Sequence, residues 1–372
     1  MNNNISFSEP TGRRRFLKHV VLGSAGLTLG AVGGLGCSSF MKQAQSFGSL
    51  KRGFNPRSGR SRVSFVTAKD QREAAYNALK PLESEILEAI GTKQVLIKVN
   101  MGQVAEDVWL NATDPNFVRG ILDFLTPVYD REIVVAESTA AGAISTLAGF
   151  ENYGYMPILR EYGNVRFADM NDATYSPRSI LSPQYHPQTI NIIDTFMDQN
   201  IYMISATRLK THNNVIATLS LKNVVMAAPI NHYTWAQRQG RNEKPLMHSG
   251  GNRELSYNLF RLATMGIQPD LAVLDGVVGM EGNGPVRGTE VEQGVAVAST
   301  DWVAADRLGV ELMGMDYNEI KYLQWCSEAG MGEDDLDNIE ILGPEYRPHI
   351  VTYRPHDNID SQREWLQEDF SA

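Results

Sequence analysis

Six short apolar runs, largely continuous and rich in valine and isoleucine, constrain the fold of this chain more than any other feature. They occupy residues 63–66, 95–99, 133–136, 201–204, 271–274 and 295–298. Hydrophobic residues that follow one another, rather than alternate with polar ones, indicate strands buried on both faces, as in a parallel sheet. The pattern therefore predicts an α/β fold: a mainly parallel sheet with helices on both faces.

Local signals mark where the helices between these strands begin and break. Residues 71–90 have apolar side chains at helical spacing, and Pro81 is expected to break or kink that helix. Asp114 and Pro115 form a helix start, with a capping side chain before a proline at the first helical position. Further helices are expected at residues 219–226, 301–313 and 317–329.

The N-terminus resembles a signal for the export of folded proteins. Residues 13–18 hold two adjacent arginines, one free position and then Phe-Leu-Lys, which is typical of a twin-arginine signal. The apolar run that follows, residues 20–35, is shorter than the roughly 20 apolar residues of a membrane span. We therefore expect residues 1–37 to be a signal peptide, the Tat translocase to be a partner during export, and the location to be periplasmic or otherwise extracytoplasmic.

The segment that ends at Cys37 leaves two kinds of processing open. Residues 34–37, Gly-Leu-Gly-Cys, resemble a lipoprotein cleavage box, although its first position is usually leucine. Lipidation of Cys37, which would anchor the protein to a membrane, and ordinary cleavage nearby are both compatible with the sequence. Residues 38–62 are expected to be a flexible linker and residues 63–372 a single domain. Cys37 and Cys326 are the only cysteines, so this chain does not supply the four thiolates that hold an iron–sulfur cluster.

The charge balance excludes one class of partner. The chain has 34 basic and 43 acidic side chains, and loss of residues 1–36 would remove four basic and one acidic of these. The remaining protein would be more acidic than the whole chain, whose net charge is −9. Because nucleic-acid binding needs a basic surface, we expect no nucleic acid among its partners.

Polar side chains lie at or just after five of the predicted strands. The carboxyl ends of parallel strands meet at one edge of a sheet, where α/β proteins bind ligands. We therefore expect a site of mixed charge there. Its candidate residues are Lys98, Asn100, Glu137, Ser138, Arg208, Lys210, His212, Asp275 and Asp301.

Two basic elements suggest roles within that site. Lys210 and His212 are two residues apart, so in an extended segment their side chains point the same way. The lysine could hold an anion while the histidine moves a proton or binds a metal, or the histidine could be a hydrogen-bonded structural residue. Lys222 and Asn223 are expected on helix 219–226, where Lys222 either binds an anion or extends along the surface.

Glycines and carboxylates add further candidates. Gly282 and Gly284 lie in a Gly-Asn-Gly-Pro sequence that forms either a turn or a set of backbone amides closing on a ligand, with Glu281 nearby as a base. Its spacing does not match a nucleotide-binding loop. Oxygen ligands for a divalent metal could come from Asp275, Glu281, Asp301 and Asp306. Asp301 could equally be only a helix cap.

One long polar segment interrupts the α/β pattern. Residues 227–253 contain several glycines and prolines together with Lys244 and His248. Because loops of this length are usually functional, we expect a lid over the site, with His248 as a binding residue. Ser138 lacks the Gly-x-Ser-x-Gly surroundings of a hydrolase nucleophile, so a serine hydrolase is disfavoured.

Several of these motifs together resemble a bacterial and archaeal family called domain of unknown function 362, over about residues 95–316. The motifs are Lys98-Val99-Asn100, Thr113-Asp114-Pro115, Glu137-Ser138, Arg208-Leu209-Lys210-Thr211-His212, Leu221-Lys222-Asn223, Asp275-Gly276, Gly279-Met280-Glu281-Gly282-Asn283-Gly284-Pro285 with Gly288, and Asp301 with Ala304-Ala305-Asp306. The resemblance implies a twin-arginine signal, which family members often have. Some members also carry ferredoxin-like cluster domains, whose cysteines this chain lacks. The resemblance implies no particular activity.

Taken together, the residues favour an exported enzyme that acts on an anionic small molecule. Lys98, Lys210 and Lys222 would hold the anion, His212 or Glu281 would act as general acid or base, and a divalent metal could assist. Asp275 is a further candidate catalytic residue. Two other functions remain open: a solute-binding lipoprotein, and an accessory protein for a redox partner.

Overall fold

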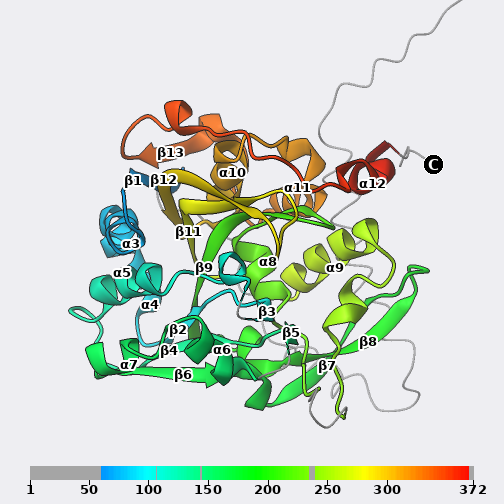
Figure 1. The fold of residues 1–372 in the computed structure, drawn as a ribbon, viewed down its shortest axis with the longest axis horizontal. Coiled ribbons are helices and arrows are strands. Elements are labelled where there is room, and N and C mark those ends of the chain that lie inside the picture. The colour runs from blue at the N-terminus through cyan, green and yellow to red at the C-terminus, as the bar shows by residue number, and fades with distance from the viewer. Residues whose placement is uncertain (1–59, 106, 143–144, 234–238, 368–372) are drawn as a thin grey trace, which may run out of the picture.

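The computed structural model describes residues 60–105, 107–142, 145–233 and 239–367 (Figure 1). The predicted signal peptide, its candidate lipidation residue Cys37 and nearly all of the linker at 38–62 lie outside the described residues. Within the described ranges, none of the helices combines the length and the apolar character that crossing a membrane requires.

A large sheet forms the centre of the described molecule. Its strands are β1 (Ser61–Thr67), β2 (Gln94–Lys98), β4 (Ile133–Glu137), β6 (Val165–Asp169), β9 (Ile201–His212), β10 (Ile216–Thr218), β11 (Leu271–Glu281), β12 (Thr289–Ser299) and β13 (Ile339–Leu342). Their order is β13-β1-β12-β11-β9-β2-β4-β6, with β10 paired to β9. β12 runs antiparallel to β1 and β11, β10 runs antiparallel to β9, and the other pairings are parallel. The predicted mainly parallel sheet is confirmed.

Helices cover both faces of this sheet, as predicted (Figure 1). On β2, Leu96 packs into one core and Ile97 into the other. The first core includes side chains of helices α8 (Ser220–Val225), α9 (Asn252–Thr264), α10 (Trp302–Leu312) and α11 (Lys321–Glu328). The second includes those of α3 (Gln71–Leu79), α4 (Glu83–Ile90), α5 (Pro115–Leu125), α6 (Thr146–Asn152) and α7 (Ile158–Glu161).

Smaller elements complete the described fold. Two strand pairs lie outside the main sheet: β3 (Gln103–Val104) with β5 (Ala141–Gly142), and β7 (Tyr175–Leu181) with β8 (Pro187–Ile193). A further short helix, α12 (Ile359–Arg363), lies near the C-terminus. The 3₁₀ turns are η2 (Lys80–Leu82), η3 (Trp109–Asn111), η4 (Met170–Asp172), η5 (Asp194–Met197), η6 (Lys244–Met247), η7 (Tyr317–Glu319), η8 (Leu336–Asn338), η9 (Arg347–His349) and η10 (Glu364–Gln367).

The helix signals in the sequence are confirmed at the level of single caps. Pro81 lies in η2, which separates α3 from α4. Asp114 accepts a hydrogen bond from the Asn116 amide (2.8 Å), and α5 begins at Pro115. Asp301 accepts hydrogen bonds from the amides of Val303 and Ala304, so it caps α10. Local capping chemistry therefore determines these helix starts.

Two expectations about the strand ends are wrong. Lys210, His212 and Asp275 were expected just after short strands, but they lie within β9 and β11, which continue because they pair with β10 and β12. Asp301 was expected at the same edge as the other candidates. Because β12 is antiparallel to β11, with Ser299 opposite Ala272 near the start of β11, Asp301 lies at the opposite edge of the sheet.

Candidate functional site

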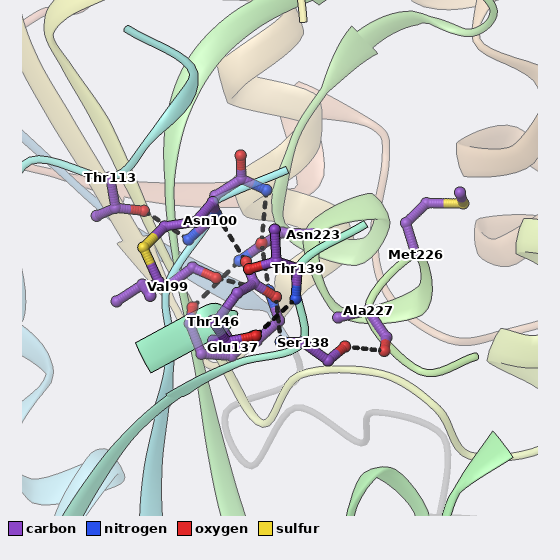
Figure 2. Close-up of polar contacts among 12 residues, drawn as sticks. Val99, Asn100, Thr113, Glu137, Ser138, Thr139, Thr146, Asn223, Met226 and Ala227 are labelled. Carbon is purple, nitrogen blue, oxygen red and sulfur yellow. Dashed lines mark hydrogen bonds and ion pairs between the residues drawn. The ribbon is translucent and has the colours of Figure 1, made fainter. Parts of the chain in front are cut away.

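A buried ion pair joins the carboxyl ends of β2 and β4. Lys98 Nζ lies 2.7 Å from Glu137 Oε1, and the two residues are 1% and 3% exposed. Glu137 also accepts hydrogen bonds from the backbone amide of Met101 (2.7 Å) and from that of Ser138 (2.8 Å), the latter shown in Figure 2. Burial lowers the pKa of Lys98, and the Glu137 carboxylate opposes that shift. The two charges therefore compensate each other.

Asn223 of α8 fixes that helix to the strand ends. Its Oδ1 accepts hydrogen bonds from Lys98 Nζ (2.9 Å) and Asn100 Nδ2 (2.8 Å), as Figure 2 shows for the two asparagines. Its Nδ2 donates to the Lys98 carbonyl and to Ser205 Oγ. Because its amide is fully used, Asn223 positions α8 rather than offering a group to a ligand.

Ser138 is held by the segment that was predicted to be a lid. Its Oγ donates to the Ala227 carbonyl (Figure 2) and accepts from Lys244 Nζ at 2.8 Å. Lys244 Nζ also donates to the carbonyls of Ala227 and Pro229, both at 2.8 Å. Burial lowers the pKa of Lys244 to about 7. The serine proton therefore points at a carbonyl oxygen and not at a base, in agreement with the sequence argument against a serine hydrolase.

Lys210 links three parts of the chain at the same edge. Its Nζ donates to Asn100 Oδ1, to the Asn111 carbonyl (2.8 Å) and, at 3.5 Å, to the Pro285 carbonyl. Burial is the main reason that its pKa lies well below the ordinary value, and the neighbouring cations Lys222, Arg208 and Lys98 lower it further.

Lys222 differs from the other lysines at this edge because its ammonium group lacks a partner. It is 6% exposed, and its Nζ forms no hydrogen bond or ion pair with any described residue. Burial lowers its pKa to about 7. The same charge acts on two histidines, because after burial itself Lys222 is the largest cause of the lowered pKa of both His212 and His248.

His212 presents a neutral ring to this group. Its Nδ1 accepts a hydrogen bond from the Asn214 amide at 3.0 Å. The hydrogen-bond geometry therefore assigns the proton to Nε2. We call His212, Lys222, His248 and Lys210 the basic cluster. They come from β9, α8 and the 227–253 segment, and the charge of Lys222 lowers the pKa of each of the other three.

Asp275 lies in β11, opposite Arg208 of the neighbouring strand β9. Its Oδ1 accepts from the Val277 amide (3.0 Å), and its Oδ2 lies 3.9 Å from Arg208 Nη1. Burial raises its pKa to about 6, and Arg208 opposes that shift. The residue is fully buried, so it has no surface to offer a substrate.

The structure does not bring the four candidate metal ligands together. Glu281 pairs with Arg354 and accepts from its amide (2.8 Å), and Asp301 caps α10. Asp306 accepts from the amides of Ser220 (2.8 Å) and Leu221 (3.2 Å) and so fixes the start of α8. Among the described residues, no group of three or more His, Cys, Asp or Glu side chains could hold a metal ion.

The glycine sequence after β11 forms a close-packed turn. A Cβ at Gly284 would lie 2.2 Å from the Thr211 carbonyl, and Thr211 Oγ1 donates to the Gly282 carbonyl at 2.9 Å. Both glycine amides donate within the protein, Gly282 to the Arg354 carbonyl and Gly284 to the Gly282 carbonyl. The glycines therefore allow the turn to approach β9, and their amides are not directed at a ligand.

The 227–253 segment is attached at several points. Glu243 is fully buried and accepts from the amide (2.6 Å) and side chain (2.7 Å) of Asn191 in β8. Asn231 donates to the Thr139 carbonyl (2.8 Å), just after β4. With the bond from Lys244 to Ser138, these contacts attach the segment to β8 and to the residues just after β4. Its action as a lid stays a prediction, and residues 234–238 lie outside the described residues.

Sequence reasoning missed two contributors to this edge. The sequence indicated Lys244 only as part of a polar segment. Its partners are Ser138, which is distant in sequence, and three backbone carbonyls, which leave no sequence signal. Asn111 contributes a backbone carbonyl to Lys210, and a carbonyl leaves no signal in the sequence.

One curated protein resembles about half of this chain. A thylakoid-associated protein of Synechocystis sp. is 25% identical over 189 residues, which are 49% of this chain and 51% of that protein. The chain thus spans about half the length of this curated relative.

Two solved structures match the chain at a low level of similarity. A protein from Thermotoga maritima gives a TM-score of 0.38 at 11% identity, covering 71% of this chain and 59% of that one. The lactate racemase apoprotein of Thermoanaerobacterium thermosaccharolyticum gives 0.37 at 11% identity, covering 70% and 59%. Likeness at this level carries no argument about the site.

The family comparison covers the candidate site itself. The sequence profile of the domain of unknown function 362 matches residues 95–311, which include the basic cluster and the Lys98–Glu137 pair. The chain therefore belongs to the domain of unknown function 362 family.

Proposed function

We propose that the protein binds an anionic small molecule at the basic cluster. The observation that carries this proposal is Lys222, a buried lysine whose ammonium lacks any partner among the described residues. A buried charge without a counter-charge lowers the stability of the fold. A ligand carboxylate or phosphate would supply the missing partner.

The surroundings of the cluster support an anion rather than a cation. The charged groups that act on Lys210 are three cations, namely Lys222, Arg208 and Lys98, and one carboxylate, Glu137. Glu137 is already paired with Lys98. Positive charge is therefore in local excess, although the chain as a whole has a net charge of −9. A local excess of one sign attracts ligands of the other.

The same groups could perform proton transfer on a bound anion. His212 carries a proton on Nε2, and the low pKa values of His212 and His248 keep both rings neutral near pH 7. Neutral imidazoles can donate or accept a proton during a reaction. We assign the acid–base role to His212 in preference to Glu281, because Glu281 is engaged by Arg354.

Non-catalytic solute binding is the second candidate. Lys98, Asn223 and Ser138 are all satisfied within the protein, which leaves few groups for chemistry. After incubation, a binding protein would return its ligand unchanged, whereas an enzyme would release a product. Mass spectrometry of the recovered small molecule separates the two.

Calorimetry with phosphate and with small carboxylates tests the binding site. We expect Lys222→Met to weaken binding at least tenfold, because it removes the unpartnered cation. Lys69→Met is the matched control: it also removes one positive charge, but from an exposed position outside the cluster, and should leave affinity unchanged. Equal affinity of wild type and Lys222→Met would contradict the proposal.

We further propose that the protein reaches its site of action through the Tat translocase. The support is the sequence of residues 13–18 and the apolar run after it. Replacement of Arg13 and Arg14 by lysine should retain the precursor in the cytoplasm. Fractionation of Cys37→Ser then tests the lipid anchor: a variant that stays bound to the membrane would exclude lipidation at Cys37.

A further inference from the structure

Two buried lysines near the site differ in the partners of their ammonium groups. Lys222 and Lys244 are 6% and 2% exposed, and burial lowers the pKa of each to about 7. Lys244 Nζ has hydrogen-bond acceptors in Ser138 and three backbone carbonyls. Lys222 Nζ has none among the described residues.

This difference decides what each nitrogen can do. The acceptors around Lys244 favour its ammonium form, because each of them needs an N–H. Nothing comparable holds a proton on Lys222. A desolvated lysine amine that keeps an unshared electron pair near neutral pH is a nucleophile.

We propose that Lys222 forms an imine with the carbonyl carbon of a small oxo acid bound at the basic cluster. The inference rests on the proposed anion site and adds the chemical class of its ligand. A carboxylate is the part of the ligand that the local excess of positive charge would attract, and a carbonyl is the part that an amine would attack.

The reaction balances without an oxidant or reductant. The Nζ electron pair forms a C–N bond while the carbonyl π electrons move to oxygen, which takes up a proton as the nitrogen loses one. The resulting hydroxyl leaves with a further proton as water, and the nitrogen pair forms the C=N bond. The protons would be carried by His212 and His248, whose pKa values the charge of Lys222 lowers. The protonated imine keeps a positive charge next to the carboxylate, so covalent capture preserves the electrostatic match.

The helix that bears Lys222 is rigidly positioned, as such a reaction requires. Asp306 accepts the amides of Ser220 and Leu221 at the start of α8. Asn223, the residue after Lys222, is bonded to β2 and β9 through Lys98 and Ser205. The nucleophile therefore lies between two fixed points of the backbone.

Reductive trapping tests this proposal on the full chain. The protein is incubated with pyruvate and sodium cyanoborohydride, and its mass should rise by that of the acid less one oxygen atom. Peptide mapping should find more adduct at Lys222 than at exposed Lys69. It should also find more at Lys222 than at Lys244, which is buried to a similar extent. Propionate, which has the carboxylate without the ketone, should bind and leave no adduct.

Lys222→Arg separates nucleophile from charge. Arginine keeps a cation but is not an amine nucleophile, so this variant should bind propionate within a few-fold of wild type and lose the adduct. The imine proposal is contradicted if wild type binds propionate but forms no adduct at Lys222, or forms as much adduct at Lys244. Either result would still be consistent with the anion site. Failure to bind either acid overturns the proposed function itself. Because the mapping uses wild type, the result does not depend on the variant folding.

Discussion

Lys222 keeps an ionisable amine in the protein interior, and this residue should make stability depend on pH in a defined direction. Its pKa is about 7 in the folded protein, against about 10.4 for an unperturbed lysine. Between these values the unfolded chain binds more protons than the folded one, so stability rises with pH from about 7 to about 10. Lys222→Met removes this contribution. Without ligand, urea unfolding should show the variant at least as stable as wild type at pH 7, with its advantage shrinking towards pH 10.

Lys244 is the matched control at the residue scale. Lys244→Met also removes a buried amine, but it leaves Ser138 and the carbonyls of Ala227 and Pro229 without their donor. Each buried acceptor left unsatisfied costs about 1–3 kcal/mol. We expect this variant to be less stable than wild type at both pH 7 and pH 9. Equal changes in stability for Lys222→Met and Lys244→Met would show that hydrogen-bond partners do not distinguish the two lysines.

Two aspartates allow the same comparison at the scale of helices. Asp306 fixes the start of α8, which carries Lys222, and Asp301 caps α10 at the opposite edge of the sheet. Loss of a capping side chain costs about 0.5–2 kcal/mol, so both Asp306→Ala and Asp301→Ala should lower the free energy of unfolding. Only Asp306→Ala should also weaken anion binding, because only it releases the helix of the site.

The measurement is urea unfolding together with calorimetry on the same two variants. An Asp301→Ala protein that loses binding to the same extent as Asp306→Ala would show that α8 does not position the site. The comparison also bears on metal binding, since both carboxylates were candidate ligands and each has instead a capping role.

At the scale of helices and strands, the sequence predicts the features that neighbouring residues determine. The caps at Asp114 and Asp301, the break at Pro81 and the strands with continuous valine and isoleucine are all confirmed, since each depends on neighbouring residues. The direction of β12 was not predictable, because apolar runs in parallel and antiparallel interior strands look alike. Because β12 is antiparallel, Asp301 lies at the opposite edge of the sheet from the candidate site.

The candidate site was predictable only in its location. Lys98 and Glu137 lie at the predicted edge, but the sequence could not show that their charges pair while the Lys222 ammonium has no partner among the described residues. Pairing of side chains from different strands and helices depends on non-local geometry. The basic motifs in the sequence therefore did not indicate which lysine lacks a partner in the described structure.

At the scale of the whole molecule, anion affinity should depend on pH through the charge of the basic cluster rather than through the net charge of the chain. The net charge of −9 repels anions at long range, so attraction must come from the basic cluster. As pH rises from 6 to 9 through the Lys222 pKa of about 7, the cluster loses positive charge and affinity for propionate should fall. Lys222→Arg, which stays charged, should show a much flatter profile by calorimetry. Affinity that rises with pH would contradict this assignment.

Binding and folding are linked, so the same dependence should appear in the thermal stability of the full chain. A ligand that binds only the folded state stabilises it by about 2.7 kcal/mol at a concentration 100 times its Kd. Saturating propionate should therefore raise the unfolding temperature of wild type clearly at pH 6.5 and little at pH 9, because the proposed site pairs the anion with protonated Lys222, whose pKa is about 7. Lys222→Met should show no rise at either pH, while Lys69→Met should follow wild type. A rise in Lys222→Met equal to that of wild type would place the anion elsewhere on the molecule.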